Sequence, residues 1–501
     1  MSAVCISAPG KVLIAGGYLV LDPQYPGLVI ATSSRFHVVI AEGSAQAESN
    51  VIEVHSPQFL NASWTYKIDD HTDGVKVQEL HDRNPQSSPN KFVYLAVQRV
   101  IAYAALVKSA QFVQDKLSKG LKIVIAGDND FYSQRAKLKA LGLPPTTASL
   151  HQLPPLGPTG TTLRDVHKTG LGSSAALITA LVTALLVQFS VISKTALAQD
   201  DVRHPDLTIA HNISQYVHCY AQGKIGSGFD VSSAIYGSHV YTRFDPQILK
   251  PIMEDQFSPT TLTEVLSASN DGWNCKVEPV TLPPRMKILL ADVDAGSDTP
   301  SLVGKVLKWR QQNKDEAESL WNAIDSNNRS LHTGFRALSQ FAAANKESYE
   351  NLIAKAVMSP ARDWPQVATA STEQAGVLNG LIALHDTTER IRKNMRHMGE
   401  LADVPIEPLQ QTRLLDLSTA VPGVVGGGVP GAGGFDAIWL LVLETADGTV
   451  EKAVQTVWST IYDMSVTPLL ARESLERGVR SEDWQRIPGL GEILSRFGIR
   501  S

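Results

Sequence analysis

A glycine–serine segment in the first half of the chain has the residue types of a phosphate-binding loop. Residues 168–177 read Lys-Thr-Gly-Leu-Gly-Ser-Ser-Ala-Ala-Leu. Gly170 and Gly172 carry no Cβ, so the backbone can turn tightly and approach a bulky anion. The helix formers after Ser174 predict a helix whose unpaired N–H groups and positive dipole end face this turn. The segment therefore predicts a polyphosphate site, with a serine hydroxyl left for a Mg²⁺ ion.

Three other interpretations compete for this segment. Gly170, Gly172 and Ala175 have the spacing of a dinucleotide fingerprint, which requires a buried strand directly before the first glycine. Residues 162–168 are charged and unlike such a strand, so the NAD interpretation is weak. A Walker A loop ends in Gly-Lys followed by Ser or Thr, and that order is missing from this sequence segment. A membrane span is disfavoured because the uncharged run that follows contains several Ser, Thr and Gln residues, which favours a buried helix.

The composition is that of an ordinary globular protein and argues against several function classes. Of 501 residues, 43% are hydrophobic and 19% charged, and this length suggests two domains. A net charge of -5 gives no electrostatic footprint for nucleic acid or an anionic membrane. Cys5, Cys219 and Cys275 lie far apart in the sequence, so neither a disulfide framework nor a zinc site is indicated. The N-terminal sequence lacks the regions of a signal peptide, and we expect a cytoplasmic protein without an obligatory protein partner.

Strand and helix patterns supply the elements that must position the loop. Short apolar, β-branched segments predict strands at residues 12–15, 28–31, 36–40, 51–54, 64–68 and 121–126. Apolar periodicity predicts helices at residues 91–107, 174–191 and 207–222. Farther on, the patterns predict a strand at 286–293, helical stretches to about residue 419, a strand at 437–443 and a helix at 450–461. We therefore expect an α/β or α+β enzyme whose site lies between its two halves.

Two irregular segments interrupt this pattern. Residues 127–165 are rich in Pro, Gly, Thr and Ser, and predict either a mobile loop beside the site or a tolerated insertion. Residues 246–284 predict a connection between domains. The expected organisation is an N-terminal domain at 1–245, this connection, and a C-terminal domain at 285–501.

Charged residues stand beside glycine turns in two further segments. Lys11 follows Pro9-Gly10 and opens an apolar strand, so it is either a cation aimed at a phosphate or a strand-end charge in water, the more common role. Asp230 follows the glycine–serine loop at 221–229, and is either a helix N-cap or a carboxylate beside the phosphates. Arg243, in the next strand-like segment, either faces the same pocket or lies on the surface.

Two later segments have several interpretations. Residues 292–301 contain paired aspartates that either bind a metal or form a solvated turn capped by Ser297 or Asp298. Residues 425–436 are dense in glycine, which indicates either close backbone approach to a ligand or strand, or a flexible hinge.

In type and order these segments resemble the GHMP kinases, the superfamily of galactokinase, homoserine kinase and mevalonate kinase. The three conserved regions of that superfamily have counterparts in Ala-Pro-Gly-Lys at 8–11, Gly-Leu-Gly-Ser-Ser-Ala at 170–175 and Gly-Ala-Gly-Gly at 431–434. Within the superfamily, the chain resembles the phosphomevalonate kinase family of the fungal type. That narrower resemblance is carried by residues 16–20 (Gly-Gly-Tyr-Leu-Val), 168–172, 224–230 and 296–300, which span nearly the whole chain.

The resemblance implies an α+β fold of two lobes, a ribosomal-protein-like N-terminal domain and a ferredoxin-like C-terminal domain. ATP would lie across the glycine–serine loop, with Ser173 contacting a phosphate and Ser174 contacting Mg²⁺. Lys11 and Asp230 match the catalytic lysine and aspartate of the superfamily. The implied ATP-binding residues are Lys168, Gly170, Leu171, Gly172, Ser173, Ser174, Ala175 and Ala176, and the implied substrate-binding residues are Tyr18, Ser227, Gly228, Arg243, Gly431, Ala432 and Gly433.

The sequence departs from the superfamily pattern at two positions. Mevalonate kinases place a Mg²⁺-binding glutamate eleven residues before the aspartate, where this chain has Cys219. That leaves the metal to serine, ATP oxygens and water. Upstream of the phosphate loop, Val166 stands where the superfamily usually has proline.

The implied reaction transfers the γ-phosphoryl group of ATP to 5-phosphomevalonate, giving 5-diphosphomevalonate and ADP in isoprenoid and sterol precursor synthesis. Two alternatives stay open: another GHMP kinase with an alcohol acceptor, such as mevalonate kinase, and an ATP-binding sensor without turnover. The presence of Lys11, Ser173, Ser174 and Asp230 argues against the sensor, because a sensor does not need the catalytic groups.

Overall fold

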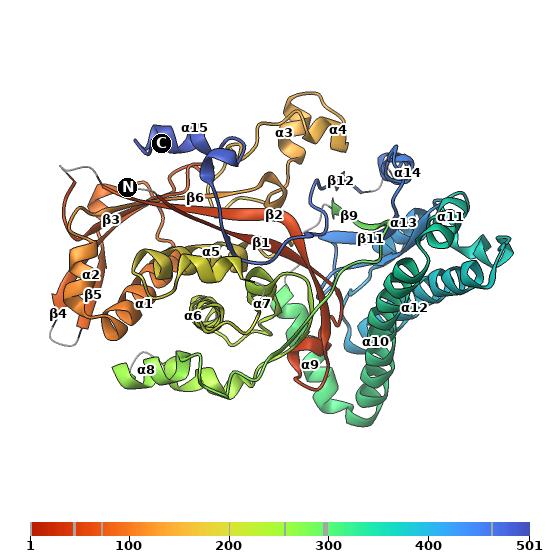
Figure 1. The fold of residues 1–501 in the computed structure, drawn as a ribbon, viewed down its shortest axis with the longest axis horizontal. Helices are drawn as coiled ribbons and strands as arrows, with labels where there is room; N and C mark the ends of the chain where they lie inside the picture. The colour runs from red at the N-terminus through yellow and green to blue at the C-terminus, as the bar shows by residue number, and fades with distance from the viewer. Residues whose placement is uncertain are drawn as a thin grey trace.

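The chain folds into two lobes, each built on one β-sheet (Figure 1). The computed structural model describes residues 3–43, 47–71, 74–199, 201–254, 257–293, 299–461 and 464–500. Within these ranges, the larger sheet has nine strands and the smaller one has four. The mixture of sheets and helices in two lobes confirms the predicted α+β class.

The first sheet is centred on two long antiparallel strands, β1 (Val4–Ala15) and β2 (Gly27–Glu42). The sequence predicted two short strands in place of β2, because polar residues 33–35 interrupt its apolar pattern. The strand can continue through Arg35 because the buried guanidinium is hydrogen-bonded within the sheet. Its Nε donates to Ser7 Oγ at 2.7 Å. The remaining strands of this sheet are β3 (Val51–His55), β4 (Ser63–His71), β5 (Gly74–Glu79), β6 (Leu121–Gly127), β7 (His239–Thr242), β8 (Lys276–Pro279) and β13 (Arg480–Ser481).

Helix α5 (Ser173–Gln188) lies directly against this sheet, where it contacts β1 and β2 (Figure 1). Its other sides contact α1 (Lys91–Val107), α6 (Pro205–Gln222) and α7 (Phe229–Tyr236). Helix α5 is therefore buried on nearly all sides, which explains its uniformly apolar sequence. Among the described residues, no helix has the length and apolar character needed to cross a membrane.

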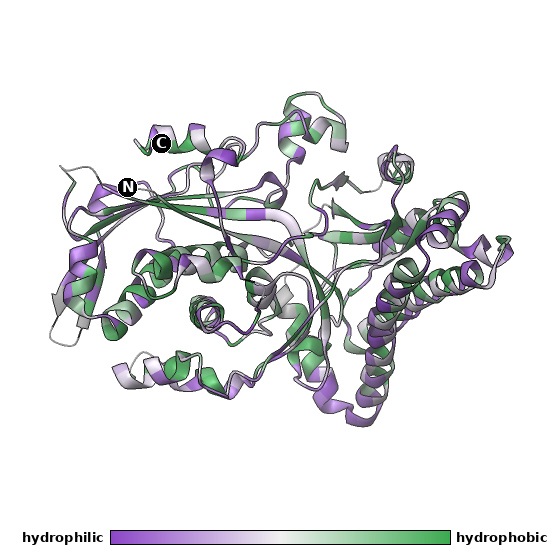
Figure 2. Ribbon diagram, in the orientation of Figure 1, coloured by the Kyte–Doolittle hydropathy of each residue, from purple (hydrophilic) through white to green (hydrophobic). Residues whose placement is uncertain are grey.

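The second sheet has the strand order β10 (Val424–Gly428), β11 (Ala437–Leu443), β9 (Met286–Val293) and β12 (Val466–Pro468), with antiparallel neighbours. One face packs against α13 (Leu409–Thr419) and α14 (Thr449–Ser459). The other face meets a group of helices that includes the long pair α10 (Lys314–Ala344) and α12 (Thr372–Ala402) (Figure 1). Helix α10 is largely hydrophilic in Figure 2, because only one stripe of its residues faces the core.

The other helices are short or peripheral. They are α2 (Ala110–Lys116), α3 (Arg135–Ala140), α4 (Thr147–Leu150), α8 (Pro259–Leu266), α9 (Thr299–Gln312), α11 (Lys346–Ala356) and α15 (Leu490–Arg496). Single 3₁₀ segments are formed by Leu19–Leu21, His81–Arg83, Asn129–Phe131, Lys194–Ala198, Pro246–Ile252, Ala361–Gln366 and Trp484–Arg486.

Two segments lie elsewhere than the expected domain division places them. Residues 246–284, expected as a connection, contribute β8, which pairs with β7 in the first sheet. The last residues return from the second lobe: β13 pairs with β1, and α15 packs against Cys5 and Val124 of the first sheet. The two chain ends therefore lie on the same side of the first lobe (Figure 1). No local sequence pattern encodes such a long-range pairing, which is why the division at residue 285 places these segments differently.

The segment at residues 127–165, expected as a loop or insertion, holds α3 and α4 and spans both lobes. Asn129 accepts from the Gly157 backbone N–H at 3.0 Å and donates to Pro154 O at 2.9 Å, which closes the segment on itself. Gln455 of α14 accepts from the Thr147 backbone N–H at 3.1 Å, which ties α4 to the second lobe.

Candidate active site

The glycine–serine loop adopts the backbone that its sequence predicts. Gly170 and Gly172 have φ angles of +77° and +75°, in the left-handed region that favours glycine. Gly172 is the N-cap of α5 and supplies no side-chain oxygen to the first turn of the helix. The N–H groups of that turn are therefore available to an anion, at the positive end of the helix dipole.

Lys11 extends from β1 over this loop. Its Nζ donates to Gly170 O at 3.0 Å and lies 5.4 Å from the centroid of the Phe229 ring. The aliphatic stem rests on Gly172, where a Cβ would come within 2.9 Å of Lys11 Cε. Burial lowers the pKa of Lys11, whereas the nearby Asp230 carboxylate raises it. Of the two interpretations of Lys11, the geometry favours the cation aimed at a phosphate.

Asp230 lies in the first turn of α7, close to Lys11. The N-cap of α7 is Gly228, so the N-cap interpretation of Asp230 is wrong. One carboxylate oxygen, Oδ1, accepts from the Val231 backbone N–H at 2.9 Å. The other, Oδ2, lies 3.9 Å from Nε2 of His218. The carboxylate is thus held at a helix N-terminus, where its charge acts on the Lys11 amine.

The loop before Asp230 is fixed by groups from β7 and α6. The Tyr241 hydroxyl donates to Ser227 O at 3.0 Å. Gly228 has a φ of +86°, and a Cβ there would come within 2.8 Å of both Tyr241 Oη and Gln215 Oε1. Only glycine fits this position, so the rigid loop sets where Asp230 stands.

Arg243, which the sequence predicted as a substrate contact or an exposed side chain, holds the same loop from another side. Its guanidinium donates to Gly226 O at 2.7 Å, to Ile225 O at 3.2 Å and to Leu21 O. Burial lowers the pKa of Arg243. Because the planar guanidinium reaches carbonyls of two loops, it joins the segment before Asp230 to the segment after Tyr18.

The second lobe reaches this site through its late glycine loop. The Tyr18 hydroxyl donates to Ala432 O at 2.6 Å, and the Gly431 backbone N–H donates to Leu13 O at 3.1 Å. Tyr18 is buried and has a φ of +63°, and burial raises its pKa, so its hydroxyl stays protonated. Gly433 has a φ of +73° and sits so close to Ile406 that any side chain would clash. The expected close backbone approach is therefore present, within the second lobe at Gly433 and between the two lobes at Gly431.

Sequence reasoning missed His218, which lies at the centre of this arrangement. Its Nε2 is 3.1 Å from Ser174 Oγ and 3.0 Å from Gln222 Nε2, as well as 3.9 Å from Asp230. The neighbouring Cys219, which stands at the expected glutamate position, is buried and accepts from Gln215 at 3.2 Å. Burial raises the pKa of the Cys219 thiol, which stays neutral. The only sequence signal for His218 is its place on a helix that must pack beside α5.

Some predicted residues are not brought into this cluster. Lys168 is exposed, and its described contact is a backbone bridge to Tyr132. Residues 294–298, including Ser297 and Asp298, lie outside the described part of the chain. Asp292 is buried and accepts from Ser133 Oγ at 2.6 Å and from Arg135 at 3.0 Å, so it joins the lobes. Nowhere in the described ranges do three or more His, Cys, Asp or Glu side chains gather as a metal-binding group.

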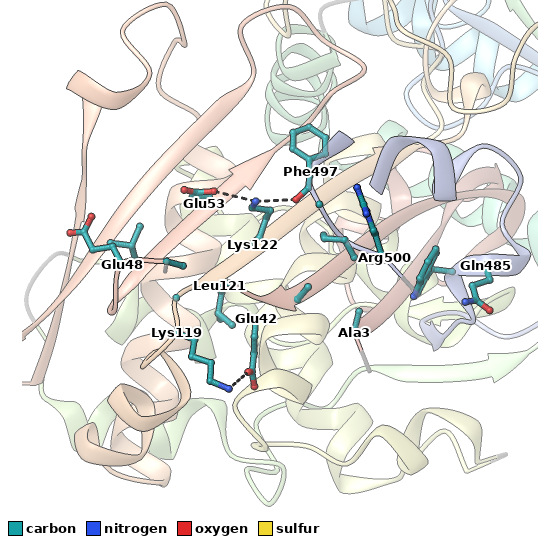
Figure 3. Close-up of a pocket in the computed structure, with 18 of the residues that line it drawn as sticks. Ala3, Glu42, Glu48, Glu53, Lys119, Leu121, Lys122, Gln485, Phe497 and Arg500 are labelled. Carbon is teal, nitrogen blue, oxygen red and sulfur yellow. Dashed lines mark hydrogen bonds and ion pairs between the residues drawn. The ribbon is translucent and has the colours of Figure 1, made fainter. Parts of the chain in front are cut away.

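A separate hollow of about 1300 Å³ lies at the far end of the first lobe, near both chain ends (Figure 3). Some of its charged side chains are paired: Lys119 lies 3.2 Å from Glu42, and Lys122 lies 3.9 Å from Glu53. Lys122 also donates to Phe497 O at 3.0 Å. None of the predicted site residues lines the hollow, which is therefore separate from the predicted site.

Comparisons with known proteins define the class. A family model described as the GHMP kinases N terminal domain matches residues 158–238, which include the phosphate loop and Asp230. A Lin0012 protein from Listeria innocua has a similar fold, with a TM-score of 0.60 and 16% identity over 96% of this chain and 100% of that one. Streptococcus pneumoniae phosphomevalonate kinase, solved with phosphomevalonate and AMPPNP, gives a TM-score of 0.55 and 16% identity over 95% of this chain and 100% of that one. The fold is that of a GHMP kinase.

Curated relatives narrow the class to one family. The chain is 38% identical to a phosphomevalonate kinase of Aspergillus fumigatus over 92% of this chain and 91% of the relative. It is 37% identical to a phosphomevalonate kinase of Arabidopsis thaliana, named as peroxisomal, over 94% of each chain. The chain belongs to the phosphomevalonate kinase family, which confirms the sequence-based expectation.

Proposed function

We propose that this chain transfers the γ-phosphoryl group of ATP to the phosphate of (R)-5-phosphomevalonate, giving 5-diphosphomevalonate and ADP. The observation that carries the proposal is the meeting of the Lys11 amine with the phosphate-loop carbonyl of Gly170 at 3.0 Å, beside Asp230. In the proposed complex the ATP phosphates lie at the N-terminus of α5, with Ser173 as a phosphate contact. The acceptor lies between Tyr18, the loop at 226–228 and the late glycine loop at 431–433.

The main chemical difficulty is electrostatic. A phosphate monoester has a second pKa of about 6, so at pH 7 it carries a charge of about -1.5 to -2 and is mostly deprotonated. The acceptor therefore needs no general base. It must, however, approach the tetra-anion of ATP, and the repulsion has to be offset by cations and N–H groups that are already in place.

Lys11 and Asp230 then have different roles. Lys11 stabilises the negative charge that develops during in-line transfer, from a position fixed by Gly170 and Gly172. Asp230 orients the lysine amine or the acceptor, and it takes no proton. Its carboxylate favours the protonated form of Lys11 against the effect of burial.

The residues near the loop also fit a Mg²⁺ ion that arrives with ATP. Mg²⁺ prefers oxygen ligands and is usually bound by one or two protein groups together with substrate phosphates and water. Ser174 and Asp230 present such oxygens, which lie 3.1 Å and 3.9 Å from Nε2 of His218. Mg²⁺ would supply partial neutralisation of the triphosphate, while Ser174 contributes its hydroxyl oxygen. The buried neutral thiol of Cys219 is unsuited to this hard cation.

The test is ADP release by the purified protein with Mg-ATP, comparing phosphomevalonate with mevalonate. Turnover with phosphomevalonate alone supports the proposal. Turnover with mevalonate would make the chain an alcohol kinase and restore Asp230 as a base. ATP binding without turnover of either compound would favour the sensor. A cytoplasmic location is part of the proposal, and fractionation of cells can test it against the peroxisomal name of the Arabidopsis relative.

A further inference from the structure

His218 is placed between two residues to which the proposed function gives chemical roles. It extends from α6, and its Nε2 lies 3.1 Å from Ser174 Oγ at the start of α5. The same nitrogen lies 3.9 Å from Asp230 Oδ2 at the start of α7. The side chain is only 3% exposed, so bulk water does not compete strongly for its contacts.

The ring nitrogen that faces Ser174 is a hydrogen-bond acceptor. Gln222 Nε2, an amide that can only donate, lies 3.0 Å from the same His218 nitrogen. An imidazolium has no acceptor nitrogen, so a ring that accepts from Gln222 is neutral. A neutral imidazole whose Nε2 accepts carries its proton on Nδ1. Because Nε2 has a single lone pair, the Ser174 hydroxyl, 3.1 Å away, shares this acceptor with Gln222 and donates its proton to it.

We propose that His218 is a positioning residue that accepts the Ser174 hydroxyl proton and thereby directs the oxygen lone pairs of Ser174 toward the metal–nucleotide complex. A serine hydroxyl has one proton and two lone pairs, so fixing the proton also fixes the lone pairs. Groups that orient a metal ligand in this way are typically worth about 10- to 100-fold in metal affinity or activity. The inference rests on the proposed function, because that function supplies the Mg-ATP that Ser174 contacts.

A neutral acceptor has an electrostatic advantage at this position. The site must collect the tetra-anion of ATP and a second phosphate, so each added negative charge increases the repulsion. A carboxylate on α6 would orient Ser174 but would also add such a charge. His218 supplies the acceptor without the charge, which fits an acceptor substrate that is itself an anion.

A double-mutant cycle on binding affinity tests this role. The affinities for ATP with excess Mg²⁺ and for ATP in EDTA are measured by calorimetry for wild type, His218→Leu, Ser174→Ala and the double variant. We expect His218→Leu to weaken Mg-ATP binding about 10-fold and ATP binding in EDTA less than about 3-fold. In the Ser174→Ala background, the same substitution should cost less than about 2-fold. Equal losses in both backgrounds would show that His218 does not act through Ser174.

Two further variants separate positioning from folding. His218→Gln retains an oxygen acceptor at similar reach and should recover Mg-ATP affinity to within about 3-fold of wild type. His211→Leu removes an equally buried histidine of α6 that is bonded to Asn212 instead, and should leave the ratio of the two affinities unchanged. A changed ratio in His211→Leu, or no recovery in a folded His218→Gln, would overturn the inference. The proposed function fails separately, if wild type does not turn over phosphomevalonate.

Discussion

Substituting Gly172 by alanine should disable the lysine of the site while leaving the fold intact. Two effects are expected. The φ of +75° places an alanine in the left-handed region, at a cost of about 1–2 kcal/mol. The new Cβ would also stand 2.9 Å from Cε and 3.1 Å from Cγ of Lys11, well inside ordinary van der Waals contact.

The second effect is the larger one for activity. Lys11 must move aside by a few tenths of an ångström to about 1 Å, and its amine leaves Gly170 O. A displacement of that size at a reacting group costs on the order of 100-fold in rate. We therefore expect kcat for Gly172→Ala to fall about 100-fold, with a decrease of only about 1–2 kcal/mol in the free energy of unfolding.

Gly142→Ala is the matched control for backbone strain. Gly142 has a φ of +65°, and a Cβ there would meet nothing within 4 Å. Both variants are compared by steady-state ADP release and by urea unfolding. The control should lose similar stability and keep its kcat. A kcat for Gly172→Ala within about 3-fold of wild type would refute the argument that this glycine makes room for Lys11.

Three further predictions concern the residues that support the site. Tyr18→Phe removes the hydroxyl that donates to Ala432 O. This change should lower the free energy of unfolding by about 1 kcal/mol and raise KM for phosphomevalonate. An unchanged KM would contradict a role of Tyr18 in joining the two lobes beside the acceptor. In Arg243→Lys, the single amine cannot reach carbonyls of both loops. We expect kcat/KM to fall at least about 10-fold and the melting temperature to stay nearly unchanged. Wild-type kinetics of this variant would contradict the prediction. His239 of β7 lies with its Nε2 2.9 Å from Ser232 Oγ of α7, and burial lowers its pKa to about 4, below its ordinary value of 6.5. The unfolded state therefore binds the proton more tightly than the folded state does. The free energy of unfolding should be highest above pH 6.5 and should decrease by up to about 3 kcal/mol as the pH falls toward 4. Urea titrations of wild type and His239→Gln at several pH values check this, and an unchanged difference between the two would contradict it.

Much of the fold follows from local patterns in the sequence. The helix predicted at residues 91–107 has these bounds, and α5 begins one residue before its predicted start. Helix and strand periodicity depends on which face is buried, and the chain carries that information locally. The pairing of β13 with β1 is different, since it joins residues more than four hundred positions apart and leaves no periodic signal.

The site residues also fall into those that local motifs predict and those that depend on long-range packing. The glycines at 170 and 172 and the lysine at 11 belong to short motifs, so their meeting could be expected from the family resemblance. The contacts of Arg243 could not be expected in this way. The sequence around an arginine does not show whether its guanidinium binds backbone carbonyls or a substrate. His218 was missed for a related reason. The contact of His218 with Ser174 depends on how α6 packs against α5, and the sequence around His218 does not encode that contact.

The central claim is that a phosphate acceptor needs charge stabilisation by Lys11 and no base. Single-turnover rates of ADP formation with Mg-ATP and phosphomevalonate test it most directly, for Lys11→Ala and Asp230→Asn side by side. We predict a larger loss for Lys11→Ala, and for Asp230→Asn a smaller loss whose size does not change between pH 6 and 8. Equal losses, together with a wild-type pH profile that requires one deprotonated carboxylate, would contradict the account.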